Sequence, residues 1–240
     1  MKAKAFLFDL DGTLVDTEVQ WARAIVDLVA SRGGRADFDE VLPTVVGRNW
    51  IDIDRALHAR YPELGDTTPD EDAVDLRAFY LRHQLKPEEM IIQGSVDFFR
   101  RAARIAPCAI VSGSPHDDVV AAARLCGIEK DLSLVLGAGE YAAGKPDPSG
   151  YLRAAELLGV APADCVVIED STVGVAAGVA AGMKVIALDR PAPVPPAFVG
   201  ETWRVPDLSR MVFLDDGDLV AEAGDLDPAD FATALAGGKR

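Results

Sequence analysis

Side chains that can do chemistry stand at or just beyond the ends of four short apolar runs in this sequence. They comprise two carboxylates, two hydroxyls, a lysine and two further carboxylates, in chain order Asp9 and Asp11, Ser112 and Ser114, Lys145, and Glu169 with Asp170. If the runs are parallel strands, their carboxyl ends share one edge of the sheet, where open α/β sheets bind their ligands. We therefore expect these groups to converge on one site.

Asp9 and Asp11 can place two carboxylates around one reacting group. Residues two apart in a strand point the same way, but the chain is leaving the strand at Gly12, so the second carboxylate can swing round the reacting group. Placed with Glu169 and Asp170, these carboxylates would repel one another unless a divalent cation lay among them, and hard oxygen ligands suit Mg²⁺. The alternative, that Asp-x-Asp ends a strand as solubilising charge or caps a helix, leaves the other three loops unexplained.

Lys145 lies in the turn AAGKPDP, where Gly144 and Pro146 hold a non-helical backbone. Beside clustered carboxylates, this lysine can neutralise an attacking carboxylate and a bound phosphoryl oxygen together. A lysine in a turn is otherwise a solvated charge, and that alternative does not require Gly and Pro to position it.

The segment Ser112-Gly113-Ser114, followed by Pro115, offers a hydroxyl and backbone N–H groups at the start of an expected helix. This arrangement suits a phosphate oxygen. Taken alone, the same residues are also typical of an ordinary N-cap.

The apolar runs favour buried strands. Their continuous apolarity is what a parallel sheet covered on both faces requires, and they span Ala5 to Phe8, Cys108 to Val111, Leu132 to Leu136, Cys165 to Ile168 and Val185 to Leu188. Segments with apolar positions three or four apart lie between most of them and favour helices at Val96 to Ile105, His116 to Cys126 and Ser149 to Leu158. This alternation predicts an α/β core with a doubly wound, Rossmann-like parallel sheet.

A stretch of roughly 70 residues after the first strand and its loop breaks this alternation. It has no strand-like run, and helical patterns occur at Val19 to Ala30, Ile51 to Arg60 and Glu71 to Arg82. We predict an inserted helical cap, because a compact domain does not tolerate so long a structureless connection. The predicted divisions are a core at 1–15 and 90–225, a cap at 16–89 and a C-terminal tail at 226–240, with a Pro-rich crossing loop at 191–198.

Composition limits the function further. The 240 residues include 24 basic and 39 acidic side chains, a net charge of −15, which repels nucleic-acid backbones and anionic lipid headgroups. An anionic ligand would therefore need local positive charge. No run reaches the roughly 20 apolar residues of a membrane span. We expect no nucleic-acid or membrane partner and a cytoplasmic location, and the three cysteines Cys108, Cys126 and Cys165 look like reduced core residues.

Four segments in order resemble the motifs of the haloacid dehalogenase-like (HAD) superfamily of phosphohydrolases. They read FDLDGTLVDTE, IVSGSP, GKPDP and VIEDSTVGVAAGVAAGM. The resemblance covers residues 6–18 and most of 108–190. The sequence is similar in particular to the branch with a helical cap after the first motif, which contains sugar-phosphate phosphatases and β-phosphoglucomutase.

This resemblance implies a role for each core residue. Asp9 would attack phosphorus to form an aspartyl-phosphate, and Asp11 would act as acid and then base. Asp9 and Asp170, with the main-chain carbonyl of Asp11, would hold Mg²⁺, and Glu169 would support the ion directly or through water. The phosphoryl group would be held by Ser112, Gly113 and Lys145. The acid/base Asp11 and the acidic pair argue against a true dehalogenase.

The resemblance places cap residues near the substrate. Glu18, Trp21 and the loop Gly47-Arg48-Asn49 would face the site, and Arg48 would meet a second anionic group or remain an exposed arginine. His116 would border the pocket or be solvated. The mutases carry a histidine at the position that Trp21 fills here, which puts mutase activity in doubt.

We therefore expect a Mg²⁺-dependent phosphatase of small phosphorylated metabolites, with a sugar phosphate or similar phosphomonoester as substrate. The alternatives are a phosphomutase like β-phosphoglucomutase and a non-catalytic protein that binds phosphorylated metabolites. An intact Asp9, Asp11 and Lys145 speak against the last. We expect a monomer or a weak dimer.

Overall fold

A parallel sheet forms the centre of the molecule. The structure, a computed structural model, describes residues 3–45, 50–83, 87–188, 202–213 and 219–221. Within these residues the sheet has six strands in the order β3-β2-β1-β4-β5-β6, and every neighbouring pair is parallel. The strands are β1 (Ala5–Phe8), β2 (Cys108–Val111), β3 (Leu134–Leu136), β4 (Cys165–Glu169), β5 (Lys184–Leu188) and β6 (Thr202–Val205).

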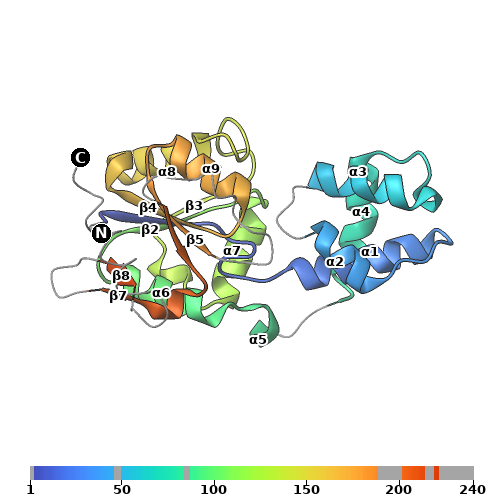
Figure 1. Ribbon diagram of the computed structural model, residues 1–240, viewed down its shortest axis with the longest axis horizontal. Coiled ribbons are helices and arrows are strands. Elements are labelled where there is room, and N and C mark those ends of the chain that lie inside the picture. Colours follow the sequence, from blue (N-terminus) through green and yellow to red (C-terminus); the bar gives the residue numbers. More distant parts are fainter. Residues whose placement is uncertain (1–2, 46–49, 84–86, 189–201, 214–218, 222–240) are drawn as a thin grey trace.

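Helices cover both faces of this sheet, because successive residues of each buried strand point to opposite sides. Phe6 and Phe8 of β1 pack with α6 (Gln93–Ala102) and α7 (His116–Leu125). Ala5 and Leu7 pack on the other face with α8 (Ser149–Leu158) and α9 (Thr172–Ala180). Figure 1 shows α8 and α9 on one side of the strands and α6 on the other. This arrangement confirms the predicted doubly wound α/β core.

The C-terminal part of the sheet goes beyond the sequence prediction. The third strand begins at Leu134, two residues later than expected, and β6 adds a sixth strand whose segment TWRV lacks a continuous apolar run. An edge strand needs only backbone pairing on one side, which β6 obtains from β5. A hairpin of β7 (Met211–Phe213) and β8 (Leu219–Ala221) follows, and its Phe213 ring stacks on Phe98 at 5.4 Å between centroids.

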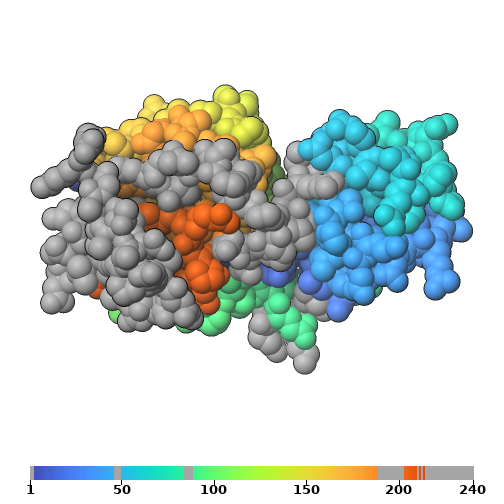
Figure 2. Space-filling model, in the orientation of Figure 1, coloured from blue at the N-terminus to red at the C-terminus, as the bar shows by residue number. Residues whose placement is uncertain are grey.

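A separate group of helices follows β1. It contains α1 (Glu18–Ser31), α2 (Phe38–Val45), α3 (Trp50–Arg60) and α4 (Pro69–Tyr80), and a short helix α5 (Pro87–Met90) precedes α6. The first four share their own apolar cluster, apart from the two clusters that cover the sheet. Helix α2 was not expected from the sequence and contains Pro43. Figure 2 shows helices α1 to α4, in blue to cyan, as a lobe beside the core.

A buried charge network ties α1, α3 and α4 together. Asp72 of α4 is 1% exposed. Nη2 of Arg32, which follows α1, lies 2.6 Å from Oδ1 of Asp72, and Nε2 of His58 in α3 lies 2.6 Å from Oδ2.

Two connections join this helical group to the sheet, and they run side by side. The Asp16 N–H donates to the Met90 carbonyl at 2.7 Å, and the Ile92 N–H donates to the Leu14 carbonyl at 3.0 Å. This pairing supports our proposal of cap boundaries at 15/16 and 89/90. Residues 191–198, for which a loop is predicted, and the predicted tail at 226–240 lie outside the described residues.

Cys108, Cys126 and Cys165 are free and buried, as predicted for reduced core residues, and burial raises the thiol pKa values to about 12, 11 and 11 respectively. Among the described residues, no helix combines the length and apolar character that a membrane crossing requires.

Candidate active site

The loop after β1 brings Asp9 to the carboxyl edge of the sheet. The Asp9 N–H donates to the Ile168 carbonyl of β4 at 2.9 Å, which continues the strand pairing by one residue. The chain then turns at Gly12, whose φ is +84°. A Cβ at this position would lie 2.0 Å from Oδ2 of Asp170, so the absence of a side chain lets the first loop approach the loop after β4.

Three buried carboxylates form an acidic cluster at this edge. Asp9, Glu169 and Asp170 each offer an oxygen, and these oxygens lie within 4.8 Å of one another. Burial raises the pKa of Asp9 well above its ordinary value, against the lowering effect of Lys145. Burial also raises the pKa of Asp170 to about 7, and the charge of Glu169 adds to this shift. Both shifts make protonation of these two carboxyl groups easier in the protein without a bound cation.

Lys145 provides the positive charge of the site. Its Nζ donates to Oδ1 of Asp9, to Oε1 of Glu169 at 2.6 Å and to the Val111 carbonyl at 3.1 Å. Burial alone would lower the lysine pKa, but the charges of Asp9 and Glu169 raise it well above its ordinary value. Lys145 is therefore a permanent cation against Asp9.

Both carboxylate oxygens of Glu169 are bonded by the protein itself. Oε1 accepts from Lys145 and from the Tyr151 hydroxyl at 2.9 Å. Oε2 accepts from the N–H groups of Asp170 and Ser171 and from the Ser171 hydroxyl, each at 3.0 Å. Glu169 thus holds Lys145 on one side and the start of α9 on the other.

Asp11 lies outside this acidic cluster and is held by two hydroxyls. Thr17 Oγ1 donates to Oδ1 of Asp11, and Ser114 Oγ donates to Oδ2, both at 2.9 Å. The Ser114 N–H donates to Oγ of Ser112 at 3.0 Å, so the loop after β2 curls around its own first hydroxyl. The loop after β1 and the loop after β2 therefore meet, as predicted from their positions at the strand ends.

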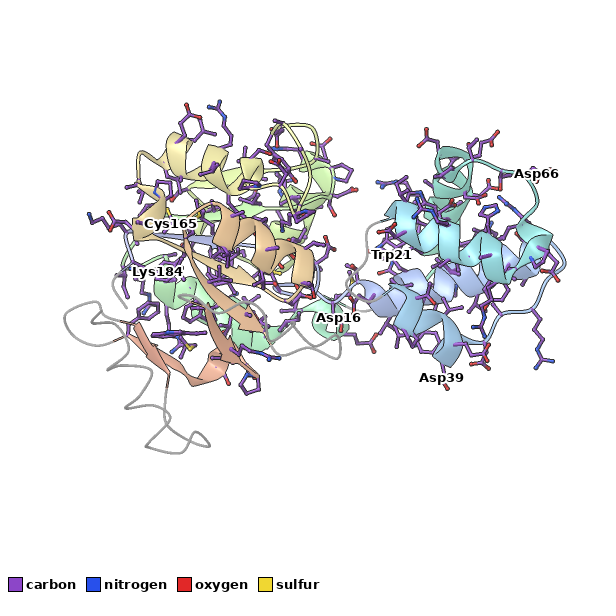
Figure 3. The ribbon with its side chains drawn as sticks, turned by 45° about the horizontal axis from the view of Figure 1, so that its top comes forward. Asp16, Trp21, Asp39, Asp66, Cys165 and Lys184 are labelled. Carbon is purple, nitrogen blue, oxygen red and sulfur yellow. The ribbon has the colours of Figure 1, made fainter. Side chains whose placement is uncertain are left out.

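A pocket of about 410 Å³ lies between the sheet edge and the helical group. Its lining includes most of the predicted site residues: Asp9, Asp11, Glu18, Trp21, Ser112, Gly113, Lys145 and Asp170. Figure 3 places Trp21 on the side of the helical group that faces the sheet. Trp21 also stacks on Tyr80, with ring centroids 4.2 Å apart.

The remaining predicted residues lie elsewhere. Glu169 is 0% exposed and sits behind the lining. His116 is not part of the lining and is about half exposed; its Nδ1 lies 2.9 Å from Oε2 of Glu140. The loop that joins β3 to α8 supplies this partner, which the position of His116 in the sequence does not reveal. Arg48 and Asn49 lie outside the described residues.

Sequence reasoning missed four residues that position the charged groups. The Thr13 hydroxyl donates to Oδ1 of Asp170 at 3.0 Å, and the Thr17 hydroxyl donates to Asp11. The hydroxyls of Tyr151 and Ser171 both donate to Glu169. Thr13, Thr17 and Ser171 lie within the quoted motifs, so their hydroxyl groups were an available signal. The sequence offers no such signal for Tyr151, because its position on the inner face of α8 indicates only a core residue.

Comparisons with known proteins agree on the family. A family model described as haloacid dehalogenase-like hydrolase matches residues 3–182. Hexitol phosphatase A of Escherichia coli (strain K12) is 35% identical over 196 residues, which are 81% of this chain and 87% of that protein. β-Phosphoglucomutase of Mycobacterium bovis is 30% identical over 210 residues, which are 77% of this chain and 80% of that protein.

A solved structure shows the same fold. The crystal structure of β-phosphoglucomutase from Clostridium difficile matches with a TM-score of 0.70 and 20% sequence identity, and the match covers 88% of this chain and 94% of that one. The family model spans the four strands β1 to β4, whose following loops carry the predicted core residues, and ends two residues after α9. The chain therefore belongs to the haloacid dehalogenase-like hydrolase family and is an enzyme of that family.

Proposed function

We propose that this enzyme hydrolyses small phosphomonoesters, with a sugar phosphate as the expected substrate class, through an aspartyl-phosphate on Asp9. One observation carries the proposal. Asp9 contacts a permanently charged lysine within an acidic cluster, and Asp11 faces the same pocket but is held apart from that cluster. Two aspartates in such different surroundings suit two different roles.

Asp9 is the nucleophile in this proposal. A carboxylate oxygen of Asp9 attacks phosphorus, and the bond from phosphorus to the alcohol oxygen breaks as the new bond forms. Lys145 orients Asp9 and offsets the negative charge that the phosphoryl group brings to the site. The hydroxyl of Ser112 and the backbone at Gly113 line the same pocket and bind the phosphoryl oxygens.

Asp11 moves the protons. It donates a proton to the departing alcohol oxygen, then removes one from the water that attacks the aspartyl-phosphate, which restores Asp9 and releases inorganic phosphate. The hydroxyls of Thr17 and Ser114 keep its carboxylate turned toward the pocket. Because Thr17 directly precedes α1, the position of the helical group influences this acid/base residue.

The acidic cluster fits a divalent cation. Its donors are hard carboxylate oxygens, and the raised pKa values of Asp9 and Asp170 reflect buried negative charge that lacks sufficient compensation. Asp9, Asp170 and the Asp11 carbonyl would hold Mg²⁺, with Glu169 supporting from behind because its own oxygens are bonded by protein donors. When bound, Mg²⁺ supplies charge stabilisation to the transferring phosphoryl group.

A panel of phosphorylated metabolites tests this function. Purified enzyme with Mg²⁺ is expected to release inorganic phosphate from sugar phosphates, to lose the activity in EDTA and to recover it when Mg²⁺ is restored. Full activity in metal-free buffer would overturn the metal assignment. Absence of phosphate release from every ester would overturn the hydrolase assignment.

The mutase is the second candidate, because the relatives include a β-phosphoglucomutase. A mutase must deprotonate a sugar hydroxyl in place of water, which requires a positioned base, and Trp21 cannot accept that proton. Incubation of β-glucose 1-phosphate with catalytic glucose 1,6-bisphosphate and Mg²⁺ separates the two fates. We expect free phosphate to form faster than glucose 6-phosphate; the reverse order would establish the mutase.

A further inference from the structure

The pocket has two chemically different sides. Its sheet side presents carboxylates, hydroxyls and Lys145. Its opposite side presents an apolar wall, by which we mean the six pocket-lining residues Trp21, Ile25, Val45, Trp50, Ile53 and Leu76. These residues come from all four helices α1 to α4 and belong to the apolar cluster at their centre, either buried in it or packed against it. Glu18, the first residue of α1, adds a carboxylate to the lining beside this wall.

The two tryptophans give this wall an aromatic surface. One face of Trp21 packs on Tyr80, with an interplanar angle of 32°, and the residue still lines the pocket. The Nε1–H of Trp50 donates to the Pro69 carbonyl at 2.9 Å, which uses its single polar atom within the helical group. Both side chains therefore offer mainly carbon and hydrogen atoms to a bound molecule.

A phosphomonoester that places its phosphoryl group at Asp9 extends its alcohol toward this wall. Hydroxyls that face the wall lose their water without gaining a hydrogen bond, which is costly. A six-membered sugar or cyclitol ring can place its C–H groups on one face and its hydroxyls elsewhere. An open-chain polyol carries a hydroxyl on nearly every carbon and has no such continuous apolar face.

We propose that the enzyme selects phosphomonoesters of ring-form alcohols, such as pyranoses or cyclitols, over open-chain polyols, with the ring stacked against Trp21. This inference rests on the proposed function and specifies the substrate class of the same pocket. It separates this chain in specificity from its relative hexitol phosphatase A, whose name refers to open-chain alcohols.

Glucose 6-phosphate and glucitol 6-phosphate form a matched pair for the test. Both carry phosphate on a primary hydroxyl of a six-carbon chain, so the leaving groups are chemically similar and only the ring differs. We expect kcat/KM for glucose 6-phosphate to exceed that for glucitol 6-phosphate by about tenfold or more, the discrimination typical of one complementary contact in an apolar pocket. Equal values, or a preference for glucitol 6-phosphate, would overturn the inference.

Variants of Trp21 test whether the wall is the cause. Trp21→Leu keeps apolar bulk but removes the aromatic face, and we expect it to reduce the preference for the ring severalfold, whereas Trp21→Phe retains most of it. Val74→Ala is the matched control, because Val74 lies on α4 with its side chain 72% exposed. An unchanged preference in Trp21→Leu would exclude the stacking role of Trp21.

Binding to an Asp9→Asn variant separates this inference from the proposed reaction. Calorimetric titration of that variant with the same two esters measures the preference without turnover. If the wild-type enzyme releases phosphate from no ester of the panel while the variant binds glucose 6-phosphate more tightly, the proposed function is contradicted and the ring preference is supported. Equal binding would contradict the ring preference even if both esters were hydrolysed.

Discussion

Lys145 shows how one residue can serve several groups at the site. Its ammonium bonds Asp9 and Glu169 together and lies 5.1 Å from the centroid of the Tyr151 ring. Glu169 in turn accepts from the Tyr151 hydroxyl. In the proposed reaction, attack by Asp9 therefore depends on Lys145, which also lines the pocket, and on Glu169 and Tyr151, which are not among the lining residues.

Asp9→Asn is expected to leave a folded protein with essentially no phosphate release. An amide is too weak a nucleophile to form the phosphorylated intermediate, although it fills nearly the same volume. Phosphate release and circular dichroism measure the two properties. Asp97→Asn, at a half-exposed position on α6, is the control and should behave like the wild type. Wild-type turnover by Asp9→Asn would exclude Asp9 as the nucleophile.

Tyr151→Phe is expected to lower kcat by about 10- to 100-fold, the range seen when a partner behind an active group is removed. The variant keeps the ring beneath Lys145 but removes the hydroxyl that bonds Glu169, so the lysine is held less firmly. KM should change much less than kcat, because Tyr151 is buried and does not line the pocket. Equal changes in both constants would argue against this positioning role.

The residues at the ends of strands and helices decide how closely the loops that carry the site residues approach one another. Ser171 caps α9 by accepting from the Gly174 N–H at 3.0 Å, and the same hydroxyl donates to Glu169. A Cβ at Gly174 would lie 1.7 Å from Oε1 of Glu169. The glycines of the first and fourth motifs therefore make room for carboxylates.

Gly12→Ala is expected to abolish most activity, whereas Gly33→Ala is expected to lower stability with little effect on activity. Both glycines have φ near +83°, a conformation that strains an alanine. A new Cβ at Gly12 also meets Asp170, but one at Gly33 meets nothing within 4 Å. Phosphate release and thermal unfolding of the two variants separate strain from collision. Equal loss of activity in both would contradict the role assigned to the close approach.

At the scale of the whole molecule, the site depends on how the helical group sits over the sheet edge. Besides the paired connections, Arg77 of α4 donates to both carboxylate oxygens of Asp118 in α7, at 3.1 and 3.2 Å. The pocket lies between these two parts, with its charged side on the sheet and its apolar wall on the helices. Because the chain carries a net charge of −15, the proposed binding of an anionic substrate needs local positive charge, which Lys145 and the proposed cation would supply.

The stability of the metal-free protein is expected to fall as pH rises from about 5 to about 8. The pKa of Asp170 is raised from its ordinary value to about 7, mainly by burial, so the folded state keeps a proton that the unfolded chain has already lost above about pH 4. Thermal unfolding in EDTA across this range measures the effect. A midpoint that rises with pH would contradict the assignment.

Mg²⁺ should reverse this trend, because it binds the deprotonated carboxylates. The stabilisation by Mg²⁺ is therefore expected to be small near pH 5 and larger near pH 8. Asp170→Asn is the matched control, since it removes the titrating group and should weaken both the pH dependence and the response to Mg²⁺. A response in that variant equal to the wild type would exclude Asp170 as a ligand.

Several features follow from the sequence alone because their signals are local. Continuous apolar runs predicted the first five strands of the sheet, and residues directly after them supplied Asp9, Asp11, Ser112, Glu169 and Asp170. The start of β3 was wrong by two residues, and β6 was missed, because edge strands take stability from backbone pairing that leaves little trace in side-chain pattern.

Only the tertiary structure shows which side chains contact one another and which residues line the pocket. Thr13 meets Asp170 across 157 residues of sequence, and His116 turns to Glu140 rather than into the pocket. The apolar patterns of α1, α3 and α4 predicted helices, but the pattern of a helix shows which positions share a face and not what that face contacts. Only the packing of the helical group against the sheet edge turned part of its apolar core into the apolar wall of the pocket, because a side chain gains its partner from elements distant in the sequence.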